Sequence, residues 1–181
     1  MGGAIEWYNS TPMAWHDDSE PDGTRWLLKA LREAAHELES QLWGLDEGDL
    51  RWRPDEDSLS LKEIAGHLRD CEEHFVRCLE LIARQEGPRL PPFDADVVLL
   101  ERDYREIDLY EALEGFAQLR QRSSMLIWNL DGEDWERSGR HPYRGDVSIS
   151  QLAREQNEHD LEHLWQVGRI REALEQRAPS R

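Results

Sequence analysis

The sequence has little cysteine, and its two cysteines are not placed to form a disulfide. Cys71 and Cys78 are the two cysteines among 181 residues. They are seven residues apart in a segment of helical pattern, which at a rise of ~1.5 Å per residue separates them by ~10 Å, beyond disulfide reach. We therefore expect thiols in a reducing compartment, and we expect Cys71 to be a small core residue rather than a reactive thiol.

Basic side chains and long apolar runs are also scarce. Lys and Arg number 22 against 39 Asp and Glu, which gives a formal net charge of -17. Such a surface repels phosphate backbones, so we expect no direct binding to nucleic acid. No apolar run approaches the ~20 residues that span a bilayer, and the start at residues 1–4 (MGGA) lacks the basic and then apolar segments of a secretory signal. We expect a cytoplasmic protein without a membrane partner.

The chain nevertheless has the means to fold. Eight Trp and a hydrophobic fraction of 38% supply large side chains that a disordered acidic chain would lack. We predict one domain over residues 21–176, with a polar lead-in at 1–20 and a short tail at 177–181. The lead-in holds Trp7, Tyr8 and Trp15. Whether it packs over the domain or stays loose is left open by its sequence.

Four segments of helical period are separated by clusters of Gly and Pro. No convincing pair of strands appears, so the predicted fold is an all-α four-helix bundle. Three of the helices have capping patterns at their starts. In the linker 88–107, the apolar run 97–100 (VVLL) fits either a helical turn or an extended crossover. The predicted helices run from Asp22 or Thr24 to about Gly44, from Ser60 and Glu63 to Gly87 and Pro88, from Asp108 and Glu111 to Asp131 and Gly132, and from Ser148 and Gln151 toward Leu174.

The apolar seam of the fourth helix is interrupted in its middle. Gln156, Asp160 and His163 occupy positions where heptad stepping would place Leu or Ile. Burying such groups without partners costs about 1–3 kcal/mol each, so something must satisfy them. His159 precedes His163 by one turn, which puts both imidazoles on one face about 6 Å apart along the axis. That spacing lets two ring nitrogens reach the same ion.

A third ligand should come from a facing helix, because two histidines alone seldom hold a metal. The second helix offers His67 and His74, and both lie on the flank of its apolar stripe, so their positions do not choose between them. Elsewhere, His16 and His36 are expected to be ordinary polar residues. His141 either borders a substrate pocket or belongs to a turn with Pro142.

Several blocks of the sequence resemble the DinB-like, or YfiT-like, superfamily of small metalloproteins. They are residues 59–70 (LSLKEIAGHLRD), 157–164 (NEHDLEHL), the Trp-Arg-Pro turn at 52–54, and the loop with 135–137 (WER) and 144–145 (RG). The likeness extends from roughly Trp26 to Leu174. It implies an up-down-down-up four-helix bundle, often a homodimer, that holds one divalent ion.

On this resemblance, the ligands are His67, His159 and His163, and His74 takes no part. Gln156 and Asp160 could orient an imidazole, although Asp160 could equally pair with Arg69 or Arg120. Three neutral imidazoles leave the ion an open position, as in catalytic sites. All four of zinc, nickel, iron and manganese accept imidazole, and we expect zinc or nickel.

An ion held in this way can lower the pKa of a bound water toward about 7 or bind a thiol as thiolate. The resemblance implies a metal-dependent enzyme, either a transferase that uses a low-molecular-weight thiol or a hydrolase. Two alternatives stay open. One is a stress-associated protein that binds a metal or small molecule without turnover, and the other is a bundle whose metal only stabilises the fold.

Overall fold

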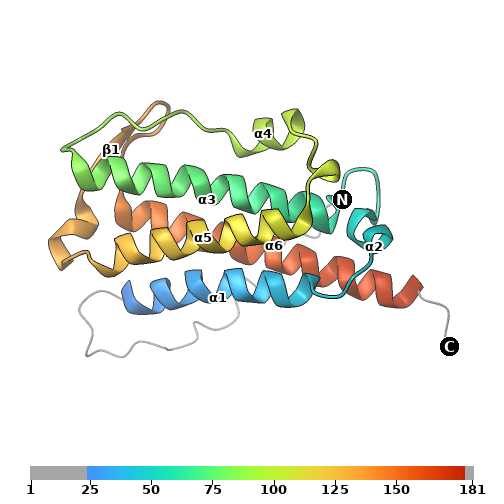
Figure 1. Cartoon of the computed structure of the whole chain (residues 1–181). Helices are drawn as coiled ribbons and strands as arrows, with labels where there is room; N and C mark the ends of the chain where they lie inside the picture. Colours follow the sequence, from blue (N-terminus) through green and yellow to red (C-terminus); the bar gives the residue numbers. More distant parts are fainter. Residues whose placement is uncertain (1–23, 178–181) are drawn as a thin grey trace, which may run out of the picture.

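The structure is a computed structural model that describes residues 24–177, and it shows the predicted bundle (Figure 1). Helices α1 and α6 run in one direction and α3 and α5 in the other, which is the up-down-down-up order. The predicted lead-in, Asp22 and the residues beyond Arg177 lie outside the described residues. The long helices are α1 (Thr24–Leu42), α3 (Leu61–Arg84), α5 (Leu109–Trp128) and α6 (Ile149–Arg177).

The starts of three helices follow from their capping residues. Ser60 and Glu63 form a capping box, in which the Ser60 backbone N–H donates to Glu63 Oε2 over 2.9 Å. The start of α6 has the same reciprocal pair: Ser148 N–H donates to Gln151 Oε1 over 2.9 Å, and Gln151 N–H donates to Ser148 Oγ over 3.2 Å. Asp108 caps α5 alone, because its side chain accepts from the backbone N–H groups of Tyr110 and Glu111. These bonds satisfy donors that the first turn leaves unpaired.

A long connection joins the parallel helices α3 and α5. It contains α4 (Ala95–Glu101) and a 3-10 turn, η2 (Tyr104–Glu106), so the apolar run 97–100 is helical rather than extended. A second short helix, α2 (Glu47–Arg51), follows α1 and was not predicted. It is only five residues long, too short to show a helical period.

The expectation of no paired strands is wrong at one place. After the 3-10 turn η3 (Gly132–Glu136), strands β1 (Ser138–His141) and β2 (Gly145–Ser148) form an antiparallel hairpin. Each strand has four residues, too few for an alternating pattern to be recognised. Backbone bonds hold the hairpin against the chain after α3: Leu90 N–H donates to Arg140 O over 3.0 Å, and Arg140 N–H donates to Pro88 O over 2.7 Å.

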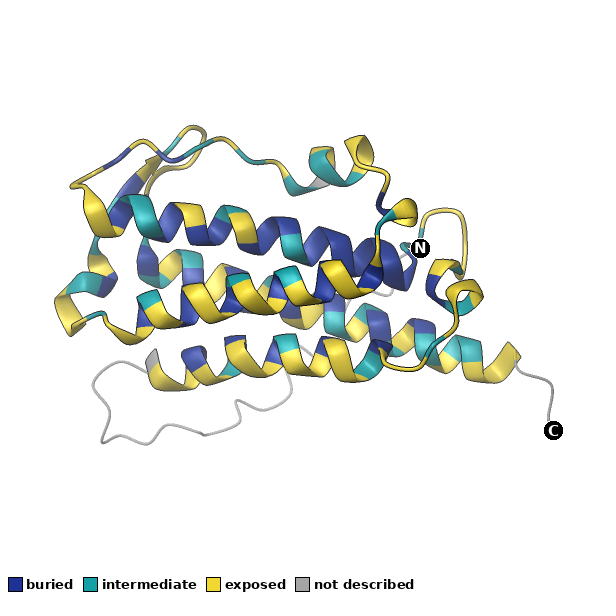
Figure 2. Ribbon diagram, in the orientation of Figure 1, coloured by how far each residue is buried: buried dark blue, intermediate teal, exposed yellow. Residues whose placement is uncertain are grey.

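The core of the bundle consists of two apolar clusters with a polar layer between them. Figure 2 shows the buried faces of the long helices turned toward one another, and α3 is buried along much of its length. All four long helices contribute to each cluster. One includes Leu31, Leu79, Ile127 and Ala153, and the other includes Leu38, Ile64, Phe116 and Val167. Between the stretches of α3, α5 and α6 that supply the two clusters lie the buried polar side chains of Glu72, Arg120, Ser123, Gln156, Asp160 and His163, and His67 borders this layer, next to Leu68 in the sequence.

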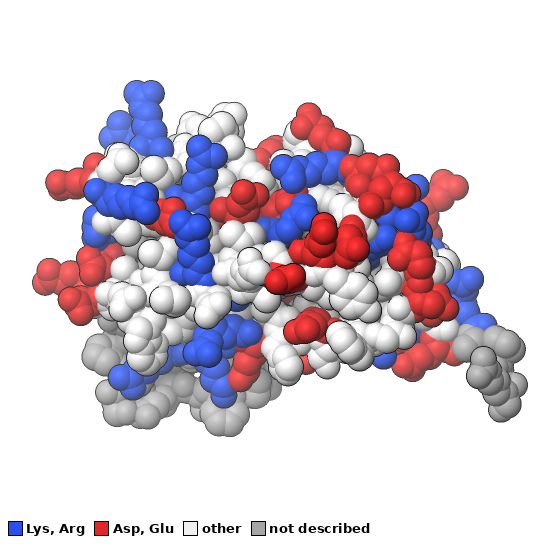
Figure 3. All heavy atoms as spheres, in the orientation of Figure 1, with Lys and Arg blue, Asp and Glu red and all other residues white. Residues whose placement is uncertain are grey.

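The surface carries both signs of charge, and the helices are amphipathic. On the face drawn in Figure 3, basic and acidic side chains are spread among each other. None of the helices between residues 24 and 177 combines the length and the apolar character needed to cross a membrane.

Gly66 allows the connection before α5 to pack tightly against α3. A Cβ at this position would overlap the Tyr104 ring and lie 2.8 Å from Ile107 Cδ1. Tyr104 is itself fixed, because its hydroxyl donates to Asp70 over 2.5 Å. We expect Gly66→Ala to lower the free energy of unfolding by about 1–3 kcal/mol through this overlap.

Urea unfolding followed by circular dichroism measures the effect, and Gly168 is the matched control. A Cβ at Gly168, in α6, would meet no atom within 4 Å. Because alanine is the better helix former, Gly168→Ala should raise the free energy of unfolding by about 0.5–1 kcal/mol. Equal effects of the two substitutions would contradict the proposed overlap at Gly66.

Candidate metal centre

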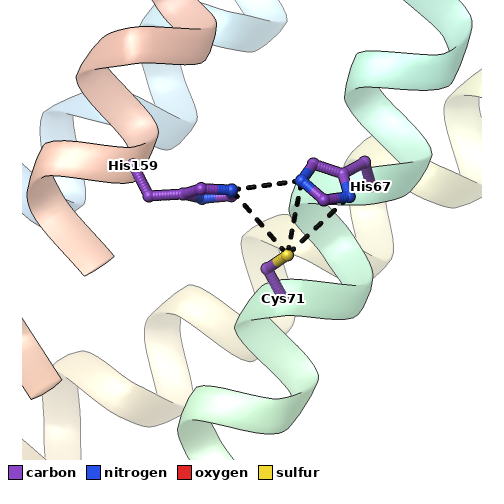
Figure 4. A group of neighbouring side chains, drawn as sticks. All are labelled: His67, Cys71 and His159. Atoms are coloured by element: carbon purple, nitrogen blue, oxygen red, sulfur yellow. Dashed lines mark hydrogen bonds between the residues drawn. The ribbon is translucent and has the colours of Figure 1, made fainter. Parts of the chain in front are cut away.

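Three histidines meet between α3 and α6. His67 comes from α3, and His159 and His163 come from successive turns of α6. The Nε2 atom of His159 lies 3.1 Å from Nε2 of His67 and 3.1 Å from Nε2 of His163. The structure therefore brings together the three side chains that the sequence predicted as ligands, and two of them are drawn in Figure 4.

Cys71 lies at the same place, which the sequence interpretation missed. It follows His67 by one turn of α3, and its Sγ is 3.6 Å from His67 Nε2, 3.9 Å from His67 Nδ1 and 4.0 Å from His159 Nε2 (Figure 4). His67, Cys71 and His159 form a group that could hold a metal ion. The prediction of a buried residue is right, since Cys71 is 6% exposed, but its surroundings are not only apolar.

Burial keeps the three imidazoles neutral at pH 7. Desolvation, followed by the neighbouring His163, lowers the pKa of His67 to about 4. Desolvation and then the two partner rings lower the pKa of His159 to about 3, and burial also lowers the pKa of His163. A neutral imidazole has a lone pair available for a cation, which is the form that binds metals.

The ring nitrogens of the three histidines are better arranged to bind a shared cation than to form hydrogen bonds with one another. His163 Nδ1 lies 3.0 Å from Gln166 Oε1, an acceptor, so Nδ1 carries the proton and Nε2 presents its lone pair to the other rings. One N–H on His159 Nε2 cannot point at both of its neighbours. Among the described residues, His159 Nδ1 is buried and has no hydrogen-bond partner. A cation shared by the three Nε2 atoms would resolve the conflict at His159 Nε2, and the proton of His159 would then be on Nδ1, which has no acceptor among the described residues.

Three polar residues near the centre, Gln156, Asp160 and Arg120, form a separate network of hydrogen bonds and ion pairs. Asp160 pairs with Arg120, its Oδ2 lying 2.7 Å from Nη1, and Gln156 Nε2 donates to Asp160 Oδ1 over 3.2 Å. Of the two partners considered for Asp160, the structure shows Arg120, while Arg69 pairs with Asp70. Burial raises the pKa of Asp160 to about 6 in spite of Arg120. A role of Gln156 and Asp160 in orienting an imidazole stays a prediction.

The other histidines of the described residues lie away from this group. His74 stacks on Phe93, with ring centroids 4.4 Å apart and an interplanar angle of 11°, and its Nε2 lies 3.3 Å from Cys78 Sγ. His141 Nδ1 accepts from Tyr143 N–H over 3.3 Å within the hairpin turn. His36 is exposed, and His16 falls outside the described residues.

Comparison with known proteins gives a family, a relative in sequence and a solved structure of similar fold. A presumed metal-dependent hydrolase of Oceanobacillus iheyensis is 20% identical over 140 residues, which are 77% of this chain and 80% of that protein. YfiT from Bacillus subtilis, described as a probable metal-dependent hydrolase with an unusual four-helix bundle topology, has a TM-score of 0.78 at 15% identity. The match covers 86% of this chain and 89% of YfiT, and it shows the shared fold.

The family model extends over most of the bundle, from within α1 to within α6. It contains the α3 segment with His67 and Cys71 and the α6 segment with His159 and His163. Because the model of the DinB superfamily matches residues 30–167, this chain belongs to the DinB superfamily.

Proposed function

We propose that this protein is a metal-dependent hydrolase whose ion is held by His67, His159 and His163. The observation that carries the proposal is the approach of three neutral imidazoles. His159 Nε2 lies 3.1 Å from Nε2 of His67 and 3.1 Å from Nε2 of His163. The names of the O. iheyensis and B. subtilis relatives, both of which refer to metal-dependent hydrolysis, support the reaction class.

The donor set favours a transition metal over magnesium or calcium. Imidazole nitrogen suits zinc, nickel, copper and iron, whereas magnesium and calcium take oxygen ligands. We propose zinc or nickel as the resident ion, with iron or manganese as further possibilities for the same nitrogen donors. When bound, such an ion supplies a Lewis acid that makes a water nucleophilic at neutral pH.

The residues of the chain prepare the site before any ion enters. The α-helical spacing of His159 and His163 fixes two nitrogens on one face, and α3 brings His67 against them. Burial keeps the rings deprotonated, so that no proton has to be displaced at pH 7. Gln166 holds His163 in the tautomer that presents Nε2.

Transfer to a low-molecular-weight thiol is a second candidate function. The observation that favours it is that a sulfur atom fits beside the imidazoles, since Cys71 Sγ lies 3.6 Å from His67 Nε2 and 4.0 Å from His159 Nε2. A site that accommodates sulfur could accept it from a small thiol as well as from the chain.

A substrate screen of zinc-loaded and nickel-loaded protein tests these candidates. The panel contains carboxylic esters, amides and phosphoesters, and each is assayed with and without a small thiol and an electrophile. We expect hydrolysis that chelation removes, that added metal restores, and that the His159→Ala, His163→Ala double variant lacks. His74→Ala is the control, because His74 lies outside the centre and should leave turnover unchanged.

The other results would each replace the proposal. Product that forms only with the thiol and electrophile would favour the transferase. Stoichiometric metal with no turnover of either kind would favour a binding protein or a structural metal.

A further inference from the structure

We infer that Cys71 is a fourth protein ligand, so that the metal centre of this chain is made of three imidazole nitrogens and one thiolate sulfur. This inference rests on the proposed metal function and deepens it, because it specifies what fills the position that three histidines alone would leave open. It departs from the three-histidine site that the sequence predicted.

Four of the donor–donor distances in the structure are close to those of a tetrahedral centre with this donor set. Zinc bonds of ~2.0–2.1 Å to nitrogen and ~2.3 Å to sulfur place two nitrogens ~3.3 Å apart and a nitrogen and sulfur ~3.6 Å apart at the tetrahedral angle. The nitrogen pairs that include His159 are 3.1 Å apart, and Cys71 Sγ lies 3.6 and 4.0 Å from His67 and His159 Nε2. These four donor–donor distances lie within about 0.4 Å of the expected values, and His67, Cys71 and His159 offer ligand atoms that all lie within 4.8 Å of one another.

The helical positions explain why the four donors converge. His67 and Cys71 are four residues apart on α3, and His159 and His163 are four residues apart on α6. Residues with this spacing lie on one face of a helix. Two such pairs, placed opposite each other by the packing of α3 on α6, supply two donors from each helix.

A thiolate ligand changes both the charge and the selectivity of the centre. One negative charge partly neutralises a divalent ion, and a soft sulfur donor favours zinc over manganese. An outside thiol would then bind only in place of Cys71 or as a fifth ligand. A reacting water then needs a fifth position, which zinc centres admit, or the displacement of Cys71.

Cys78 provides a matched control on the same helix. Like Cys71, it is buried and lies four residues after a histidine, with Sγ 3.3 Å from His74 Nε2. That histidine stacks on Phe93 and is not among the three that meet between α3 and α6. Each cysteine therefore lies on α3, four residues after a histidine whose imidazole is next to its sulfur. Of the two, Cys71 alone has a further imidazole beside it, that of His159 in α6.

Cobalt substitution tests the inference in the full chain without an assay of activity. Cobalt(II) is added to wild-type protein without any external thiol, and the near-ultraviolet absorption is recorded together with the metal content. We expect one cobalt per chain and a sulfur-to-cobalt charge-transfer band. Cys71→Ser should lose the band, and Cys78→Ser should keep it. Circular dichroism checks that each variant is folded.

Two further measurements distinguish a ligand from a neighbour. Cys71→Ala should bind zinc at least about 10-fold more weakly than wild type, because the loss of a ligand costs no less than the loss of a residue that orients one. A small added thiol should restore the charge-transfer band to cobalt-loaded Cys71→Ala, since the vacated position then accepts outside sulfur.

Each result has a clear meaning. Stoichiometric cobalt without a thiolate band in wild type, or a band that persists in Cys71→Ser, would overturn the ligand role of Cys71 and leave the three-histidine proposal intact. The absence of any cobalt binding would instead overturn the proposed metal site itself.

Discussion

Protein in which His159 and His163 are both replaced by alanine is expected to retain less than about one tenth of the wild-type metal, because two donors of the same ion are gone. The wild type, purified without a histidine tag, should contain about one transition metal ion per chain. Elemental analysis of both proteins makes the comparison. His67 and Cys71 would remain on α3, but a pair of donors from one helix lacks the opposing pair that closes the site.

The loss of metal should also appear in stability. An ion that binds only the folded chain raises its free energy of unfolding by about 2.7 kcal/mol when present at 100 times its dissociation constant. Addition of zinc should therefore raise the melting temperature of the wild type but not that of the double variant. His74→Ala serves as the control, since it removes a half-buried histidine of α3 that stacks on Phe93, and it should keep both the metal and the response.

Metal that remains stoichiometric in the double variant would contradict the assignment of these ligands. So would a double variant whose melting temperature responds to zinc as the wild type does. A parallel drop in the His74→Ala control would mean that loss of any imidazole in this part of α3 disturbs the centre, and the ligand assignment would then lose its support.

Arg120→Leu is expected to destabilise the fold by about 3–5 kcal/mol, because it leaves two buried carboxylates without their positively charged partner. Arg120 is 2% exposed and pairs with Glu72 and Asp160, with 2.7 Å between the charged atoms in each case. Its guanidinium also donates to the carbonyl of Leu31 in α1. One side chain thus connects α5 to the three other long helices. Chemical denaturation gives the change in the free energy of unfolding.

Arg122 on the same helix supplies the comparison. It pairs with Glu80, but it is 58% exposed, so Arg122→Leu should cost less than about 1 kcal/mol. Simultaneous replacement of Glu72, Arg120 and Asp160 by leucine should recover much of the loss from Arg120→Leu alone, because no unpaired buried charge then remains. Similar losses for Arg120→Leu and Arg122→Leu would contradict the argument from burial.

The sequence was informative where a local rule decides the structure. Capping residues such as Ser60 and Ser148 set helix starts through bonds to residues three positions away, and the structure has those bonds. The polar break in the fourth helix was visible because Gln156, Asp160 and His163 interrupt a heptad pattern. The hairpin at 138–148 and helix α2 were missed because elements of four or five residues carry too little periodicity.

The role of Cys71 could not be predicted because it depends on a contact between helices. The spacing of four residues after a histidine occurs twice on α3, at Cys71 and at Cys78, and the sequence gives no reason to prefer either. Only the packing of α6 places His159 beside Cys71. For the same reason, His67 could not be chosen over His74 from helical position, and that choice came from the family resemblance. The partner of Asp160 likewise became clear only from the packing of α5.

The polar layer between the two apolar clusters divides the bundle into two possible units of unfolding. Local opening in proteins follows such boundaries, since each cluster can lose its packing while the other persists. An ion bound between α3 and α6 would hold the two helices together at this boundary, because its ligands come from both of them. Metal loading would then govern the cooperativity of the whole chain, so that amide exchange in the two halves is coupled with the ion present and independent without it.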